Sequence, residues 1–219
     1  MKISNHILKH YLKNVLFING TAYAGKSTMV KLLADKYDLV HCGENYKCAP
    51  DELLNPQQYP SLCYFQTMKG WQEFISRTPE AYYDWIMGCT RELIEFEIIY
   101  LIRASQYQKV VVDTNLPLDI LREIADYNQV AIMICSPSMS VECFFERDDA
   151  DKVFLREQIM KAKNPKEAMA HYRKILEYGA HKTYEAMKDS EFFTLTRTDV
   201  VNDTKQETAD ILAKHFGLE

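Results

Sequence analysis

Nine residues near the N-terminus have the types and the spacing that bind phosphate. They read Gly20, Thr21, Ala22, Tyr23, Ala24, Gly25, Lys26, Ser27 and Thr28, which matches the pattern G-x-x-x-x-G-K-[ST]. The glycines permit backbone angles that other residues avoid, so that N–H groups can turn inward around phosphate oxygens. Lys26 adds a mobile positive charge for the terminal phosphates. The Ser27 hydroxyl can ligate the Mg²⁺ that accompanies a nucleoside triphosphate.

The residues on either side decide between this interpretation and a glycine turn of another α/β protein. Residues 14–19 form a short apolar run that predicts a buried strand. Residues 26–36 place Met29, Leu32 and Leu33 at helical spacing. The order strand, loop, helix favours a phosphate site, because a helix N-terminus adds partial positive charge.

Two carboxylates follow predicted strands. Asp113 ends the run 110–112, and we expect it to hold magnesium with Ser27 or to orient the attacking hydroxyl. The alternative is a polar cap where a strand leaves the sheet. Glu44 follows the predicted strand 38–43 and could accept a proton from a substrate hydroxyl or bind the substrate. Capping of the next turn is an equally good account of Glu44.

Basic residues follow the predicted strand 130–135. Phosphoryl transfer spreads negative charge over the transferring group, which calls for cations above the phosphates. Arg147 and Arg156 flank a charged turn and are the candidates, with Lys152 and Arg173 as further possibilities. The alternative is a solvated helix face with surface ion pairs.

The rest of the chain alternates strands and helices. Further strands are predicted at 109–115 and 192–196, and helices at 78–106, 118–127, 140–147, 152–163, 166–188 and 204–216. This alternation predicts a parallel sheet covered on both faces, with ligands beyond the carboxyl ends of the strands.

Two aromatic regions call for different interpretations. In the helix 78–106 an aromatic and aliphatic stripe predicts core packing, with Arg91, Glu92, Glu95 and Glu97 largely off that stripe. Residues 45–70 hold tyrosines and prolines without a helical period. Such a stretch is typical of a binding loop or lid, and base or sugar stacking is one use for its rings.

Composition sets the class of protein. A chain of 219 residues with 47% hydrophobic content predicts a single domain, 1–219. The net charge of -5 makes nucleic acid an unexpected partner. The six cysteines form no C-x-x-C pair and are expected to be free thiols. No run has the length of a membrane span, and we expect a soluble, cytoplasmic protein without a membrane partner.

With these residues in place, the chain resembles the P-loop nucleoside triphosphate hydrolase superfamily, in its nucleoside and nucleotide kinase-like branch. The resemblance rests on residues 20–28, on Glu44, on Asp113 and on the arginines after the fourth strand. It implies a three-layer α/β fold with a five-stranded parallel sheet in the order 2-3-1-4-5. It also implies ATP with Mg²⁺, a substrate-binding insertion at about 45–78 and a lid at about 144–165. Arg197 and Thr198 would approach the adenine.

The chain departs from known members of this family where the substrate is chosen. Asp113, Thr114 and Asn115 stand where thymidylate and deoxynucleoside kinases carry Asp-Arg-Tyr or Asp-Arg-Ser. The Asp-x-Asp pair of shikimate kinases has no counterpart after the second strand. The acceptor is therefore left open.

The expected function is an ATP-dependent phosphotransferase acting on a small molecule. Lys26 would neutralise the phosphates, Ser27 and Asp113 would hold magnesium, Glu44 or Asp113 would position the acceptor, and Arg147 or Arg156 would close over the transferring group. The alternative is a nucleotide-dependent regulator without an acceptor. The sequence lacks the N-K-x-D motif of GTP switches, which counts against GTP and leaves an ATP-hydrolysing regulator. A kinase of nucleic-acid ends is disfavoured by the acidic balance. The sequence does not indicate an oligomeric state.

Overall fold

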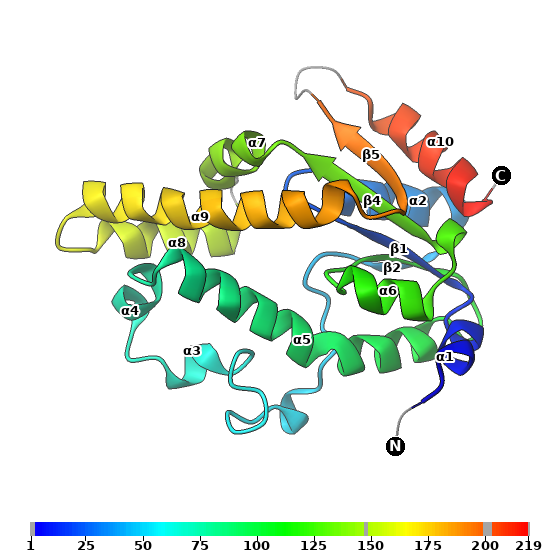
Figure 1. Ribbon diagram of the computed structural model, residues 1–219, viewed down its shortest axis with the longest axis horizontal. Helices are drawn as coiled ribbons and strands as arrows, with labels where there is room; N and C mark the ends of the chain where they lie inside the picture. The colour runs from blue at the N-terminus through cyan, green and yellow to red at the C-terminus, as the bar shows by residue number, and fades with distance from the viewer. Residues whose placement is uncertain (1–2, 147–148, 199–202, 219) are drawn as a thin grey trace.

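The computed structural model describes residues 3–146, 149–198 and 203–218. Five strands alternate with helices (Figure 1). The strands are β1 (Val15–Gly20), β2 (Val40–Cys42), β3 (Val110–Asp113), β4 (Val130–Cys135) and β5 (Phe193–Arg197). The helices are α1 (Asn5–Tyr11), α2 (Lys26–Tyr37), α3 (Tyr64–Thr67), α4 (Trp71–Ile75), α5 (Pro79–Ala104), α6 (Leu118–Ile124), α7 (Pro137–Glu142), α8 (Ala150–Met160), α9 (Pro165–Lys188) and α10 (Lys205–Phe216).

The strands form one parallel sheet in the order β2-β3-β1-β4-β5. This confirms the predicted α/β class, the parallel sheet and the strand order. β1 lies in the middle of the sheet, where Ile18 is in register with Asp113 on one side and with Ala131 on the other. The carboxyl ends of β1 and β3 therefore lie next to each other.

Helices cover both faces of the sheet, as the alternating pattern predicts. α2 and α10 pack on one face over Leu16, Ile18 and Val111. On the other face lie α5, α6 and the C-terminal part of α9, over Phe17, Val112 and Ile132 among others. β1 and β4 are buried along their whole length, which is why they read as continuous apolar runs.

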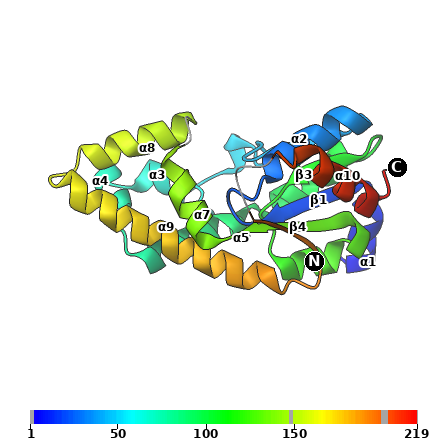
Figure 2. The same ribbon diagram turned by 90° about the horizontal axis from the view of Figure 1, so that it is seen from above.

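A helical lobe extends beyond the sheet (Figure 2). We use this name for α3, α4, α8 and the N-terminal halves of α5 and α9, whose shared core is Phe74, Ile75, Leu155, Ile159, Tyr172 and Ile175. The lobe joins the predicted insertion to the predicted lid. The rings of Trp71 and Phe154 lie 4.8 Å apart, and Gln72 Nε2 donates to Gln158 O at 3.1 Å.

The segment after β2 packs on α5. Tyr46 lies against Tyr100 with ring centroids 5.1 Å apart, and Tyr59 lies 5.2 Å from Phe96. These tyrosines therefore pack against α5, a structural role that the sequence of residues 45–70 did not indicate because it has no helical period. Stacking of a base or sugar on this segment stays a prediction.

The helices predicted at 140–147 and 152–163 both begin earlier in the structure, the second of them at Ala150. The sequence pattern placed a helix at 140–147, but α7 begins at Pro137 because the Ser136 hydroxyl caps it, accepting from Met139 N at 3.3 Å. A short 3-10 helix, Cys143–Glu146, follows. In the described part of the chain no helix has the length and apolar character to cross a membrane.

Candidate functional site

Residues 20–28, called here the glycine loop, join β1 to α2 at the carboxyl edge of the sheet. Gly20 has a φ of 140°, and a Cβ there would lie 1.7 Å from Met133 O. Thr21 N donates to that same carbonyl at 2.9 Å. Gly25, with a φ of 94°, begins α2. The two glycines of the motif are thus required, one by close contact with β4 and both by their backbone angles.

Residues at the end of β4 and in α7 hydrogen-bond to the loop. Thr21 Oγ1 accepts from Cys135 N at 2.9 Å, and Ser140 Oγ donates to Ala22 O at 2.8 Å. The Cys135 thiol also lies 3.1 Å from Ala22 O. Cys135 and Ser140 were not predicted to belong to the site, because contacts made through loop carbonyls leave no pattern in the sequence.

Three side chains meet at the start of α2. Ser27 Oγ donates to Asp113 Oδ2 at 2.7 Å, and Lys26 Nζ lies 3.7 Å from Asp113 Oδ1. Lys26 Nζ also donates to Thr21 O at 3.2 Å. The side chains of Lys26 and Asp113 are 12% and 3% exposed, so that the ion pair is largely removed from water. The structure brings these three predicted residues together.

Glu44 completes the group from the end of β2. Its Oε2 lies 3.5 Å from Ser27 Oγ. Burial raises the pKa of Asp113, the Lys26 charge and the Ser27 hydrogen bond lower it, and the Glu44 charge raises it. Asp113 and Glu44 thus place two carboxylates beside the Ser27 hydroxyl.

A cavity of about 460 Å³ opens between the glycine loop and the β5–α10 side of the sheet. Its volume is in the range of small-ligand sites, about 300–1,000 Å³. Met29, Met133, Leu195 and Ile211 give it apolar walls, and its other lining residues include Gly25, Thr28, Thr196, Arg197, Thr198 and Lys205. Arg197 Nη1 donates to Tyr23 O at 2.8 Å. Arg197 and Thr198, predicted to approach an adenine, thus border a cavity at the loop.

Of the two predicted lid arginines, the structure describes Arg156. Arg147 is outside the described residues. Arg156 lies on α8, where its Nη1 donates to Phe145 O at 2.6 Å. Closure of either arginine over a phosphate stays a prediction.

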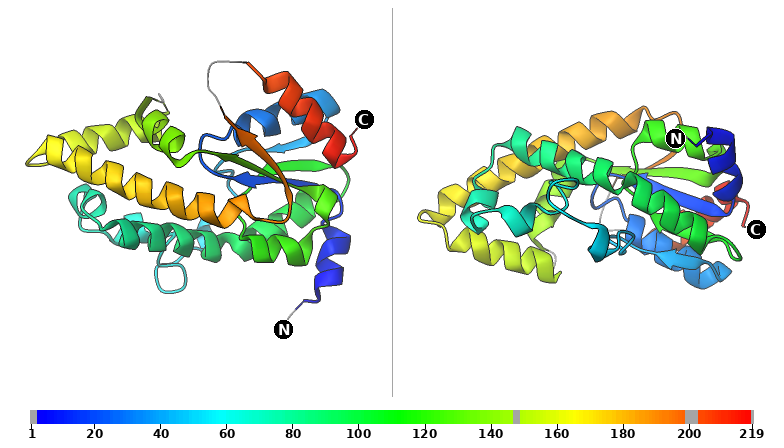
Figure 3. Two further views of the ribbon diagram at one scale, coloured as in Figure 1. Left: turned by 45° about the horizontal axis from the view of Figure 1, so that its top comes forward. Right: turned by 90° about the horizontal axis from the view of Figure 1, so that it is seen from below.

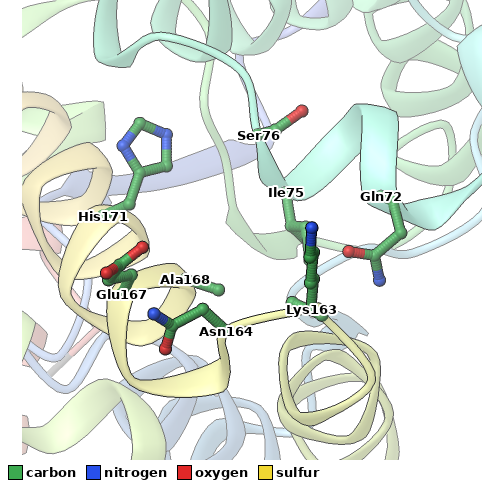
Figure 4. A pocket seen from close by; sticks show the side chains of 9 residues that line it. Gln72, Ile75, Ser76, Lys163, Asn164, Glu167, Ala168 and His171 are labelled. Atoms are coloured by element: carbon green, nitrogen blue, oxygen red, sulfur yellow. The ribbon is translucent and has the colours of Figure 1, made fainter.

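A second cavity, of about 610 Å³, lies in the helical lobe between α4 and the start of α9 (Figure 4). Its lining side chains are Gln72, Ile75, Ser76, Ala162, Lys163, Asn164, Glu167, Ala168 and His171. His171 Nε2 is 2.7 Å from Arg77 O and fixes the turn before α5. No residue of the glycine loop lines this cavity, so it does not belong to the site described above.

Three polar residues near the glycine loop are buried, and none of them was predicted to belong to the site. Asn19, Thr114 and Glu97 are 0%, 1% and 7% exposed. The placement of Glu97 off the buried stripe of α5 was wrong. α5 lies under the sheet, and Glu97 faces the end of β3 instead of solvent, where Thr114 Oγ1 donates to it at 2.6 Å. Burial raises the pKa of Glu97.

No model of a known protein family matches the chain, and no curated protein matches its sequence.

Proposed function

We propose that the protein is an ATP-dependent phosphotransferase of the P-loop type, acting on a small molecule. The observation that carries the proposal is the contact of Ser27 and Lys26 with Asp113 below a glycine loop. A loop of this kind at a helix N-terminus is suited to bind phosphate, and the buried carboxylate beside the Ser27 hydroxyl is suited to a divalent cation.

The donor nucleotide would lie across the glycine loop. Lys26 would neutralise the terminal phosphates, since its ammonium group is held at the loop by Thr21 O and Asp113. The cavity beside Arg197 and Thr198 has the volume and the apolar walls for a purine base. ATP would therefore lie along this edge of the sheet with its phosphates on the loop.

Mg²⁺ fits the same site by its ligand chemistry. Ser27 Oγ and Asp113 Oδ2 are hard oxygen donors 2.7 Å apart. Among the described residues no three His, Cys, Asp or Glu side chains gather as a metal-binding group. An ion that keeps waters and phosphate oxygens as its other ligands suits such a site. When bound, Mg²⁺ would neutralise charge that develops on the phosphates.

The acceptor side of the site would be formed by Glu44 and the segment after it. Glu44 or Asp113 would take the proton from the acceptor hydroxyl, since both carboxylates surround Ser27. The insertion 45–78 would hold the acceptor, and Arg147 or Arg156 would approach the transferring group from the lid 144–165.

Calorimetric titration with Mg·ATP tests the proposal. Lys26→Ala removes a charged donor to the phosphates, worth about 1.5–3 kcal/mol, so ATP affinity is expected to fall about 10- to 100-fold. Lys31→Ala is the matched control, because Lys31 is an exposed lysine on the same helix. Unchanged ATP affinity in Lys26→Ala, in a protein that melts as one folded species, would contradict the proposal.

Phosphate release separates the kinase from the regulatory alternative. A kinase is expected to release phosphate from ATP slowly without an acceptor and to turn over faster with the right metabolite. Rapid release that ignores every added metabolite would favour the ATP-hydrolysing regulator.

A further inference from the structure

A chain of buried hydrogen bonds connects the long helix α5 with the glycine loop. It begins at Glu97, whose Oε1 accepts from Thr114 Oγ1 at 2.6 Å. Leu116 N donates to Thr114 Oγ1 at 3.0 Å, and Asn19 Nδ2 donates to Leu116 O at 2.7 Å. Gly20 N then donates to Asn19 Oδ1 at 2.6 Å. Four hydrogen bonds thus lead from Glu97 to the first residue of the loop.

Each link has the donor and acceptor that the next link requires. Thr114 Oγ1 accepts from Leu116 N through a lone pair and donates its single hydrogen to Glu97 Oε1. The Asn19 amide uses its NH₂ group on Leu116 and its oxygen on Gly20. The side chains of Glu97, Thr114 and Asn19 are all buried. When one of them is removed, the hydrogen-bonding groups that it satisfied remain buried without a partner.

This series of hydrogen bonds lies next to Asp113, which accepts from Ser27 Oγ. Asp113 directly precedes Thr114, whose N–H donates to Ile18 O at 3.0 Å. The peptide after Asp113 is therefore held on both sides, by β1 through the backbone and by α5 through Glu97. α5 itself runs from the helical lobe along one face of the sheet to the region of α1, as Figures 1 and 3 show.

We propose that Glu97 is a positioning residue of the triphosphate site, holding the Asp113–Leu116 turn and, through Asn19, the first peptide of the glycine loop. The proposal rests on the proposed function and deepens it. Glu97 reaches the site through Thr114, and acts by fixing where Asp113 and Gly20 lie. A carboxylate that merely satisfied a core hydroxyl would contribute to stability alone.

The experiment measures phosphate release from Mg·ATP, which needs no identified acceptor, for Glu97→Leu, Thr114→Val and Glu97→Gln. The first two variants break the chain with side chains that a core accepts. Loss of such an orienting partner typically costs about 10- to 100-fold, and we expect kcat to fall by that factor while KM for ATP changes far less. Glu97→Gln keeps a carbonyl that accepts from Thr114 and is expected to restore most of kcat.

Two further measurements separate positioning from stability. The double variant Glu97→Leu with Thr114→Val should be no slower than either single variant, because both break the same link. Amide hydrogen exchange at Leu116 and Gly20 should accelerate in Glu97→Leu. Glu95→Leu, on the exposed side of the same helix, is the control and should leave both readouts at the wild-type level.

Several outcomes would overturn the proposal. The first is a Glu97→Leu kcat equal to that of Glu95→Leu when both variants are folded at the assay temperature. The second is a Glu97→Gln kcat as low as that of Glu97→Leu. The third is a loss of kcat in the double variant equal to the product of the two single losses. In each of these the wild type still binds and hydrolyses ATP, so the assignment of the triphosphate site, on which the proposed function rests, is not affected. A wild-type protein that neither binds nor hydrolyses ATP would overturn both.

Discussion

Ser27 and Asp113 lie 86 positions apart in the chain, yet the Ser27 hydroxyl donates to the Asp113 carboxylate at 2.7 Å. The contact exists because β1 and β3 are parallel neighbours that end at the same edge, with Ile18 in register with Asp113. Ser27 is in the first turn of α2, which begins at Lys26 directly after Gly25. The geometry joins a hydroxyl and a carboxylate at a point where a helix N-terminus also favours anions.

The magnesium dependence of ATP binding should disappear in Asp113→Asn. The amide keeps the shape of the carboxylate but lacks its charge, so Mg²⁺ loses a ligand that it prefers. We expect affinity for Mg·ATP to fall about tenfold, or about 1.4 kcal/mol, and affinity for ATP in EDTA to change little. Calorimetry in both conditions measures this. Asp119→Asn, an exposed site on α6, is the control, and equal Mg²⁺ dependence in both variants would count against the assignment.

Two helix glycines should respond to alanine in opposite directions. A Cβ at Gly88 of α5 would lie 2.2 Å from Ser61 Oγ, whereas a Cβ at Gly179 of α9 meets its nearest atom, Tyr83 Cδ2, at 4.0 Å. Overpacking costs about 1–3 kcal/mol, which outweighs the helix propensity that Gly88→Ala gains. Gly179→Ala should stabilise by up to about 1 kcal/mol. Urea unfolding of both variants checks the two signs, and a shared sign would refute the packing argument.

Glu92 should hold the middle of the insertion 45–78 in place. Its carboxylate accepts from Ser61 N at 3.0 Å and from Leu62 N at 2.9 Å. Glu92→Leu leaves both N–H groups without this partner, at a cost of about 1–3 kcal/mol. We expect faster cleavage near residue 61 in limited proteolysis and a lower melting temperature, with Glu95→Leu unchanged. Wild-type cleavage rates in Glu92→Leu would show that the aromatic contacts alone hold the segment.

His215 should make the protein less stable in acid. Its ring stacks on Phe193 at 4.2 Å, its Nε2 is 2.9 Å from Val130 O, and burial lowers its pKa from the ordinary value of 6.5. The unfolded chain then binds the proton more readily, so stability is full above about pH 6.5 and falls as the pH drops toward the folded pKa.

His215→Phe keeps a ring against Phe193 and removes this titration. Between pH 8 and pH 5 the variant should therefore lose less unfolding free energy than the wild type, as measured by urea unfolding at each pH. His181→Phe, at an exposed position of α9, should retain the wild-type pH dependence. An equal acid loss in His215→Phe and the wild type would rule His215 out as the cause.

The local elements of this protein could be predicted from neighbouring residues. The apolar run before Gly20, the glycines and the helix after Lys26 are encoded in neighbouring residues, because backbone angles and strand burial depend on local chemistry. The runs at 110–112 and 130–135 likewise predict strands that the structure contains. The parallel arrangement followed from the alternation of elements, and the strand order followed from the family resemblance.

Contacts between distant side chains could not be predicted in this way, because they depend on how the elements pack. By helical period Glu97 lies off the aromatic and aliphatic stripe of α5. It is nevertheless buried, because α5 packs near the end of β3, where Thr114 Oγ1 donates to it. Asn19 gains its partners from Leu116 and Gly20 in the same way. The sequence of a continuous apolar strand indicates neither its register with the neighbouring strands nor which helix packs against it. Contacts across the sheet therefore depend on how the elements pack, and no local pattern reports them.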